Sequence, residues 1–143
     1  MPQTVDNKEL VRRYLNAFNE QDRDALSDIL AEDVTEHGTH EEHHGPEAVI
    51  DLHQSYFETF PDYSGSTEAM IAEDDMITVR YTASGTHTEK FENIEPTGQE
   101  AEWSGIVIYR IEDDQIAEIW IEEDRLGMLE QLEEVDPPAH LRV

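Results

Sequence analysis

Asp124 is the residue of this sequence whose surroundings best suit acid–base chemistry. It is the last residue of the segment 115–124, in which apolar and polar side chains alternate, and it lies four residues after Trp120. A carboxylate that is partly removed from water beside aromatic bulk has its charged form disfavoured and becomes a stronger base. The sequence therefore predicts that Asp124 acts as a general acid or base. A helix N-cap and an ordinary surface carboxylate stay open as alternatives, because the chain carries 35 acidic residues.

The expected surroundings of Asp124 follow from a hairpin. If Asp113-Asp114 is a two-residue turn between the segments 99–111 and 115–124, the register places Trp103 opposite Asp124. Side chains alternate along a strand, so one face should carry Trp103, Val107, Tyr109, Glu118, Trp120 and Asp124. The opposite face should carry Ile106, Ile108, Ile119 and Ile121. We expect the mixed face to line a pocket, since ligand sites combine apolar walls with a few polar groups. The alternative buries the isoleucine face and leaves the mixed face in solvent.

Histidine and tyrosine side chains on predicted helices form a second group of candidates. His53 lies four residues before Phe57 on one stripe of a helix, and Tyr14 lies on the corresponding stripe of an earlier helix. We expect His53, Phe57 and Tyr14 to contact a ligand, with His53 as a possible acid or base. A core histidine bonded to the backbone and a packed tyrosine with a satisfied hydroxyl are the alternatives.

Four histidines are clustered in one short polar segment, which we expect to be a loop. They are His37, His40, His43 and His44, with Glu36, Glu41 and Glu42 among them. Imidazoles and carboxylates can bind zinc or nickel, but this spacing matches no ordered helix or hairpin ligand set. We therefore predict no metal, and consider His37 for the rim of the pocket.

The order of helices and strands predicts an α+β fold. Helical periodicity marks three segments and then a short one near the C-terminus: about 6–18, 22–30, 46–60 and 125–134. Alternation marks an extended piece at 33–38 and strands at 64–73, 76–91, 99–111 and 115–124. Helices followed by an antiparallel meander favour one α+β domain over 1–143, with 135–143 as a C-terminal tail.

The charge is strongly one-sided, at a formal net of −26 with 9 basic residues against 35 acidic ones. Carboxylates scattered over the whole chain would repel each other at low salt, whereas molar salt shortens the Debye length to about 3 Å. We therefore expect a halophilic protein. Such a surface disfavours nucleic acid and anionic membranes as partners. The chain has no cysteine and the polar N-terminus has no apolar leader, so we expect a cytoplasmic protein.

Several short motifs, in order along nearly the whole chain, resemble the SnoaL-like polyketide cyclase family. They are Gly45-Pro46-Glu47 leading to Phe60-Pro61-Asp62, then Gly85-Thr86-His87-Thr88, Pro96-Thr97-Gly98, and Ile116 to Trp120 through Asp124 to Gln131-Leu132. The resemblance implies the cone-shaped fold shared with nuclear transport factor 2 and ketosteroid isomerase. Three N-terminal helices would pack on a strongly curved, mostly antiparallel sheet of four to six strands, followed by a short C-terminal helix. It also implies a homodimer or larger homo-oligomer.

The resemblance implies chemistry as well. Asp124 matches the aspartate that serves ring-closing members as general acid and base in an intramolecular aldol condensation, without metal or cofactor. A small, mostly apolar ligand would then contact Tyr14, His37 and His53. The chain departs from those members where they carry a glutamine and a histidine, because Trp103 and Gly105 stand there. A non-catalytic ligand-binding protein, and a scaffold with a filled cone, stay open as alternatives.

Overall fold

The structure, a computed structural model, describes residues 3–38, 41–91 and 94–132. Its elements in chain order are α1 (Gln3–Asn19), α2 (Arg23–Ile29), β1 (Leu30–His37), β2 (Glu42–His44), α3 (Pro46–Thr59), β3 (Ser64–Glu73), β4 (Met76–Thr86), β5 (Glu100–Glu112), β6 (Gln115–Glu123) and α4 (Arg125–Gln131). The predicted α+β class and the order of elements are confirmed. The predicted tail 135–143 lies outside the described residues.

Two predicted boundaries were wrong. Part of the histidine-rich segment is a short strand, β2, which pairs with β1 through Glu42 and His37. The strand predicted for 76–91 ends at Thr86. The His87 N–H still donates to Gln99 O in the register of the β4–β5 pairing, but the His87 carbonyl accepts from the Gly98 N–H, so the regular pairing stops there.

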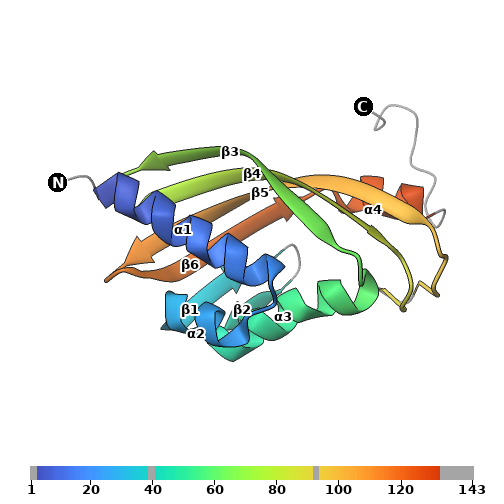
Figure 1. Cartoon of the computed structure of the whole chain (residues 1–143), viewed down its shortest axis with the longest axis horizontal. Coiled ribbons are helices and arrows are strands. Elements are labelled where there is room, and N and C mark those ends of the chain that lie inside the picture. Colours follow the sequence, from blue (N-terminus) through green and yellow to red (C-terminus); the bar gives the residue numbers. More distant parts are fainter. Residues whose placement is uncertain (1–2, 39–40, 92–93, 133–143) are drawn as a thin grey trace.

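The described residues form one six-stranded sheet in the order β2-β1-β6-β5-β4-β3. β1 runs parallel to β6, and the other neighbouring pairs are antiparallel. The strands curve, and α1 crosses in front of them while α3 runs along the lower edge of the sheet (Figure 1). α1 packs against β3 and β4, and α3 packs against β1, so both helices lie on the concave side of the sheet.

The register of the β5–β6 hairpin differs from the predicted one by one residue. Asp113 and Asp114 form the predicted two-residue turn, and both adopt positive φ, as a type I′ turn requires. Beyond the first pairs, however, Ile111 pairs with Ile116 and Arg110 pairs with Glu118, so Ala117 is an extra residue. This β-bulge reverses the face that every later side chain of β6 occupies.

A compact aromatic cluster closes one end of the cone. Trp103, Phe60, Met128 and Leu132 are its largest members, and Trp103 is 3% exposed. The Trp103 and Phe60 ring centroids lie 5.0 Å apart. Gly85 allows this packing, because a Cβ there would lie 2.5 Å from the Phe60 Cβ. Trp103 is therefore a core residue.

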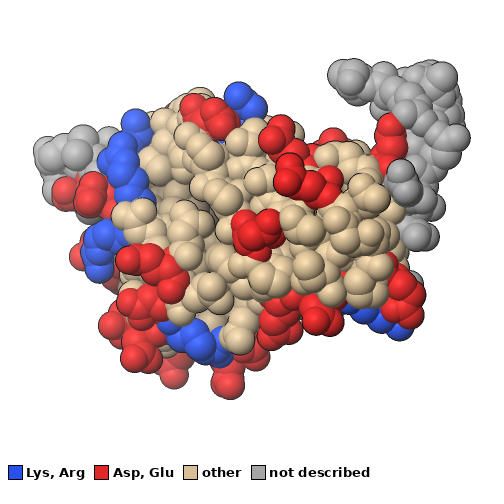
Figure 2. Space-filling model, turned by 45° about the vertical axis from the view of Figure 1, so that its right-hand side comes forward, with Lys and Arg blue, Asp and Glu red and all other residues tan. Residues whose placement is uncertain are grey.

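Acidic side chains are spread over the face of the molecule shown in Figure 2, where basic side chains occur in few places. None of the helices in the described residues is long and apolar enough to cross a membrane.

Candidate active site

A cavity of about 170 Å³ lies between helices α1 and α3 and the concave face of the sheet. All 5 tyrosines of the chain line it: Tyr14, Tyr56, Tyr63, Tyr81 and Tyr109. Aliphatic side chains from β4, β5 and β6 contribute to the apolar part of the wall, and three glutamates, two histidines and an arginine also line the cavity. The cavity thus has the composition of a ligand site, with apolar walls and a few polar groups.

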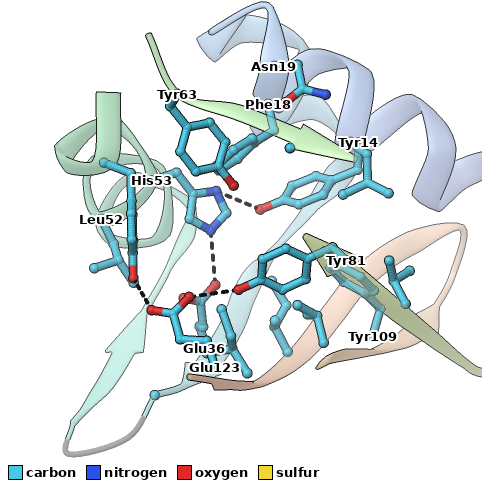
Figure 3. A pocket seen from close by; sticks show the side chains of 18 of the residues that line it. Tyr14, Phe18, Asn19, Glu36, Leu52, His53, Tyr63, Tyr81, Tyr109 and Glu123 are labelled. Carbon is cyan, nitrogen blue, oxygen red and sulfur yellow. Dashed lines mark hydrogen bonds and ion pairs between the residues drawn. The ribbon is translucent and has the colours of Figure 1, made fainter. Parts of the chain in front are cut away.

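A hydrogen-bonded chain of three side chains occupies one side of the cavity. His53 Nε2 lies 3.2 Å from Glu36 Oε1, and His53 Nδ1 lies 3.1 Å from the Tyr14 hydroxyl (Figure 3). If Nε2 carries the proton and donates to Glu36, Nδ1 is free to accept from Tyr14. Glu36 is 2% exposed, and its neighbour on the same face of β1, Val34, is fully buried. The chain therefore joins a buried carboxylate to an imidazole and a phenol.

The second buried carboxylate, Glu123, is held by two tyrosines. The Tyr56 hydroxyl donates to Oε1 at 2.6 Å and the Tyr81 hydroxyl donates to Oε2 at 2.7 Å. Arg125 completes the cluster, with its Nε 3.4 Å from Glu123 Oε1 and its guanidinium donating to the Tyr56 oxygen at 3.2 Å. The Glu123 side chain is 5% exposed. Both of its oxygens thus already have donors from the protein.

Helix α3 positions both carboxylates. His53, which contacts Glu36, and Tyr56, which contacts Glu123, are three residues apart and lie on the same face of the helix. Three residues rise about 4.5 Å along a helix axis. The cavity wall therefore presents the two anionic groups on successive turns of one rigid element.

The cavity tyrosines are held in their protonated form. Burial is the main cause that raises the pKa of Tyr14, and Tyr109 and Glu36 raise it further. Burial likewise raises the pKa of Tyr63 and Tyr109, with a smaller contribution from nearby Glu123 and Glu36 respectively. The same cause, followed by the charge of Glu123, raises the pKa of Tyr56 and Tyr81. These hydroxyls are therefore hydrogen-bond donors at any ordinary pH.

Several polar groups of the wall have no hydrogen-bond partner within the described part of the chain. Among them are the hydroxyls of Tyr63 and Tyr109, the Oε2 atom of Glu36 and the Nδ1 atom of His43. Tyr109 is 4% exposed, so its hydroxyl is removed from bulk water. Buried polar groups are normally paired, and unpaired ones that face a cavity are available to a ligand. The two tyrosine hydroxyls as donors and Glu36 Oε2 as an acceptor are thus among the groups available to a bound molecule.

Asp124 does not lie in the cavity, and the predicted placement is corrected. Its side chain caps α4, accepting from the Gly127 backbone N–H at 2.8 Å, and the residue is exposed. The bulge at Ala117 is the physical reason, because it turns Glu123 inward and leaves Asp124 beyond the strand end. The N-cap alternative describes the observed geometry.

The other predicted contact residues divide between the cavity and the rest of the molecule. Tyr14 and His53 lie on the cavity wall. Phe57 packs between Phe18 and Tyr63, with ring centroids 5.5 and 5.1 Å away, and lines a smaller hollow between α1, α2 and α3 instead. Trp103 belongs to the buried cluster with Phe60, Met128 and Leu132 at one end of the cone.

Trp120 and His37 lie on the convex face of the sheet, opposite the cavity. Because of the bulge, Trp120 pairs with Ile108 and with His37 of β1, and its ring stacks on the imidazole at 5.4 Å. His37 also bonds Glu118 at 2.6 Å and Glu42 at 2.9 Å. Hydrogen bonds to Glu118, and then to Glu42, raise the pKa of His37. The prediction that Trp120 and His37 border the pocket was wrong for this reason.

The histidine cluster is dispersed in the structure. His43 lies at the cavity wall, His44 lies near Thr35 on β1, and His40 is outside the described residues. Among the described residues, no group of three or more histidine, cysteine, aspartate or glutamate side chains could hold a metal ion.

Sequence analysis missed Glu36 and Glu123. In the extended segment 33–38, alternation places Val34 and Glu36 on the same face of the strand. This shared face could have indicated that Glu36 points inward. Glu123 follows Ile119 and Ile121 at the same alternation, but the bulge that turns this face inward has no sequence mark that we recognise.

Comparison with known proteins agrees with the fold. The sequence profile of the SnoaL-like polyketide cyclase family matches residues 8–132. A SnoaL-like protein from Jannaschia sp. CCS1 is 21% identical, with a TM-score of 0.87 over 96% of this chain and 97% of that one. IdmH from Streptomyces antibioticus, a candidate polyketide cyclase, is 26% identical, with a TM-score of 0.78 over 89% and 98%. AclR from Streptomyces galilaeus, a candidate hydroxylase, is 23% identical, with a TM-score of 0.83 over 96% and 92%. No functionally curated protein gives a significant match.

The curved sheet, the helices on its concave side and the cavity between them define a cone-shaped α+β protein of the nuclear transport factor 2-like type. Within that class, the chain belongs to the SnoaL-like polyketide cyclase family.

Proposed function

We propose that the protein is a cofactor-free enzyme that moves a proton next to a carbonyl group of a compact substrate, as in an aldol-type cyclisation or an isomerisation. The observation that carries this proposal is the buried chain Glu36–His53–Tyr14 beside the unpaired hydroxyl of Tyr109. The base is Glu36, in place of the Asp124 suggested by the family resemblance.

Glu36 has the geometry of a general base. One of its oxygens accepts from His53, and the other has no partner within the described residues. His53 is a positioning residue, because it fixes the orientation of the carboxylate and is itself held by Tyr14. A carboxylate with an open oxygen beside a largely apolar cavity can take up a proton from an acidic carbon of a bound ligand.

Tyr109 supplies the second part of the chemistry. Removing a proton next to a carbonyl leaves negative charge on the carbonyl oxygen, and a preorganised donor stabilises that charge. The Tyr109 hydroxyl is such a donor, because its raised pKa keeps the proton and no described residue accepts it. Ketosteroid isomerase combines an aspartate base with a tyrosine donor in the same manner, and the comparison is an analogy.

The size of the cavity limits the substrate. Its volume of about 170 Å³ is smaller than the roughly 300–1,000 Å³ of sites for drug-sized ligands. We therefore expect a substrate closer in size to a single aromatic ring with a short side chain than to a multi-ring polyketide.

Hydrogen–deuterium exchange at carbon tests the proposal without the natural substrate. Phenylacetone in D₂O with 2 M KCl should exchange its α-protons faster with protein than without it, as followed by NMR. Glu36→Gln should lower the catalysed rate at least about 100-fold, and Tyr109→Phe should have an effect of similar size. Glu122→Gln is the matched control, because Glu122 is exposed on the neighbouring position of β6.

Thermal melts of each variant separate lost chemistry from lost folding. A folded Glu36→Gln variant that exchanges as fast as the wild type would contradict the proposal. Phenylacetone that binds without any accelerated exchange would favour a ligand-binding protein, the alternative function.

A further inference from the structure

We infer that this cavity selects ligands by charge, admitting neutral and cationic molecules and rejecting carboxylates and phosphates, with Glu123 as the residue that sets the selection. The inference deepens the proposed function, on which it rests for the location of the ligand. It concerns a residue that the proposed chemistry does not use as a base.

The charges on the cavity wall are not balanced. Glu36 and Glu123 are both nearly buried and both line the cavity, whereas Arg125 is the one lysine or arginine among the described residues that line it. Arg125 lies beside Glu123, and no lysine or arginine among the described lining residues lies beside Glu36. With the glutamates ionised, the charges of the carboxylates and of the one arginine on the wall sum to a negative value. Glu41, exposed and also on the lining, adds to the same sign.

Burial makes this imbalance effective. Charges in a protein interior act at a lower effective dielectric constant than charges in water, and salt screens them much less. An anionic ligand in the cavity would lie close to both carboxylates, since His53 and Tyr56 hold them from successive turns of α3. It would also lose its own hydration. A neutral ligand of the same shape is not repelled by the carboxylates and does not lose the hydration of a charged group.

The unpaired groups on the wall agree with this selection. Tyr63 and Tyr109 offer donors, which suit a carbonyl oxygen, and Glu36 Oε2 offers an acceptor, which suits an acidic C–H, a hydroxyl or an amine. The one guanidinium of the wall is already engaged by Glu123 and the Tyr56 oxygen, so a ligand carboxylate would have to compete with Glu123 for it. These groups therefore suit a carbonyl compound without a carboxylate or phosphate group, including one that bears an amine.

A set of three probes of nearly equal size tests the inference. They are 2-phenylethanol, phenethylamine and phenylacetate, titrated at pH 8 in 1 M KCl and followed by NMR or calorimetry. High salt suppresses attraction and repulsion by the outer carboxylates of this −26 chain. The wild type should bind the alcohol and the amine, and it should bind phenylacetate at least about 30-fold more weakly than the alcohol.

The selectivity gap is the ratio of the affinity for 2-phenylethanol to the affinity for phenylacetate. Two variants should change this gap in opposite directions. Glu123→Gln removes one negative charge and frees Arg125 from its carboxylate partner, so the gap should shrink at least about tenfold. Arg125→Gln removes the positive charge, so the gap should widen. Glu122→Gln makes the same charge change one residue away, on the exposed face of β6, and should leave the gap within about twofold of the wild type.

The inference is overturned if the wild type binds phenylacetate as well as 2-phenylethanol, or binds none of the probes. It is also overturned if the gap is the same in Glu123→Gln and Glu122→Gln. Should Glu123→Gln fail to fold, the direction of the change in Arg125→Gln decides. Because these titrations measure binding and the deuterium experiment measures proton transfer, failure of the inference and failure of the proposed function are separate results.

Discussion

The hydroxyl of Tyr81 lies over the backbone of Gly105, in space that any other residue at position 105 would fill. A Cβ there would lie 2.6 Å from Tyr81 Oη, and the two residues are paired across β4 and β5. This close approach lets Tyr81 reach Glu123 at 2.7 Å. Gly105 is therefore a positioning residue for the second carboxylate of the cavity.

Gly105→Ala should displace the Tyr81 ring and weaken its hydrogen bond to Glu123. We expect a loss of about 1–3 kcal/mol in the free energy of unfolding, as for other overpacked sites. In a double-mutant cycle measured by urea denaturation, Tyr81→Phe should reduce the cost of Gly105→Ala by at least about 0.5 kcal/mol, because the hydrogen bond to Glu123 that the added methyl group weakens is then already absent. Costs that simply add would contradict a role of Gly105 in positioning that hydrogen bond.

The fold could be predicted from the sequence because each of its elements has a local signal. Helical stripes and strand alternation marked α1, α3, β3 and the turn at Asp113-Asp114 to within a few residues. The family motifs then implied the cone. The catalytic assignment failed at one bulged residue, Ala117, because a one-residue shift reverses the two faces of a strand and local propensity does not record it. The contact of His53 with Glu36 depends on the parallel pairing of β1 with β6, which joins segments far apart in the sequence.

The ion pair between His37 and Glu118 on the convex face should raise the free energy of unfolding over a defined pH range. Hydrogen bonding to Glu118 raises the pKa of His37 above its ordinary 6.5, and hydrogen bonding to His37 lowers the pKa of Glu118 below its ordinary 4.5. The contribution of His37 is thus complete below about pH 6.5 and is lost as pH rises through its raised pKa. The contribution of Glu118 is complete above about pH 4.5 and is lost as pH falls through its lowered pKa.

His37→Gln should therefore destabilise the protein near pH 5.5 and have almost no effect at pH 9. The loss should not exceed about 1 kcal/mol, since the pair is partly exposed, which corresponds to a shift of a few degrees in Tm. Glu42 also faces His37, so His37→Gln should be compared with Glu42→Gln, which removes the second partner alone. If His37→Gln lowers the free energy of unfolding equally at both pH values, the histidine stabilises the protein by packing against Trp120 and not by its charge.

Salt should stabilise the folded chain strongly if the expected halophilic character is correct. A net charge of −26 on 143 residues produces self-repulsion that molar KCl screens. Between 0.1 and 3 M KCl we expect Tm to rise by at least about 10 °C, which for a chain of this size corresponds to roughly 2–3 kcal/mol. Sucrose at matched osmolality is the control for general exclusion effects. A Tm that is indifferent to KCl would refute the prediction.

The homodimer implied by the family resemblance stays a prediction, and the convex face of the sheet offers a place for it. One row across this face joins Ile71, Thr78, Ile108 and Trp120, and Ile106 lies in the adjoining row. Ile71 is 66% exposed and Ile106 is 46% exposed, an unusual pair of surface residues for so polar a chain.

Ile106→Glu should place a carboxylate in the middle of that face and convert a dimer into a monomer, as measured by light scattering in 2 M KCl. The matched control is Leu126→Glu, which makes the same kind of change at a residue that is 38% exposed on α4, away from the convex face. Burying an unpaired carboxylate in a dry interface costs several kcal/mol, enough to lower the affinity of a typical dimer by a factor of about 1,000 or more. A dimer that survives Ile106→Glu but dissociates with Leu126→Glu would move the interface to the α4 end of the cone, and a wild-type monomer would reject the dimer itself.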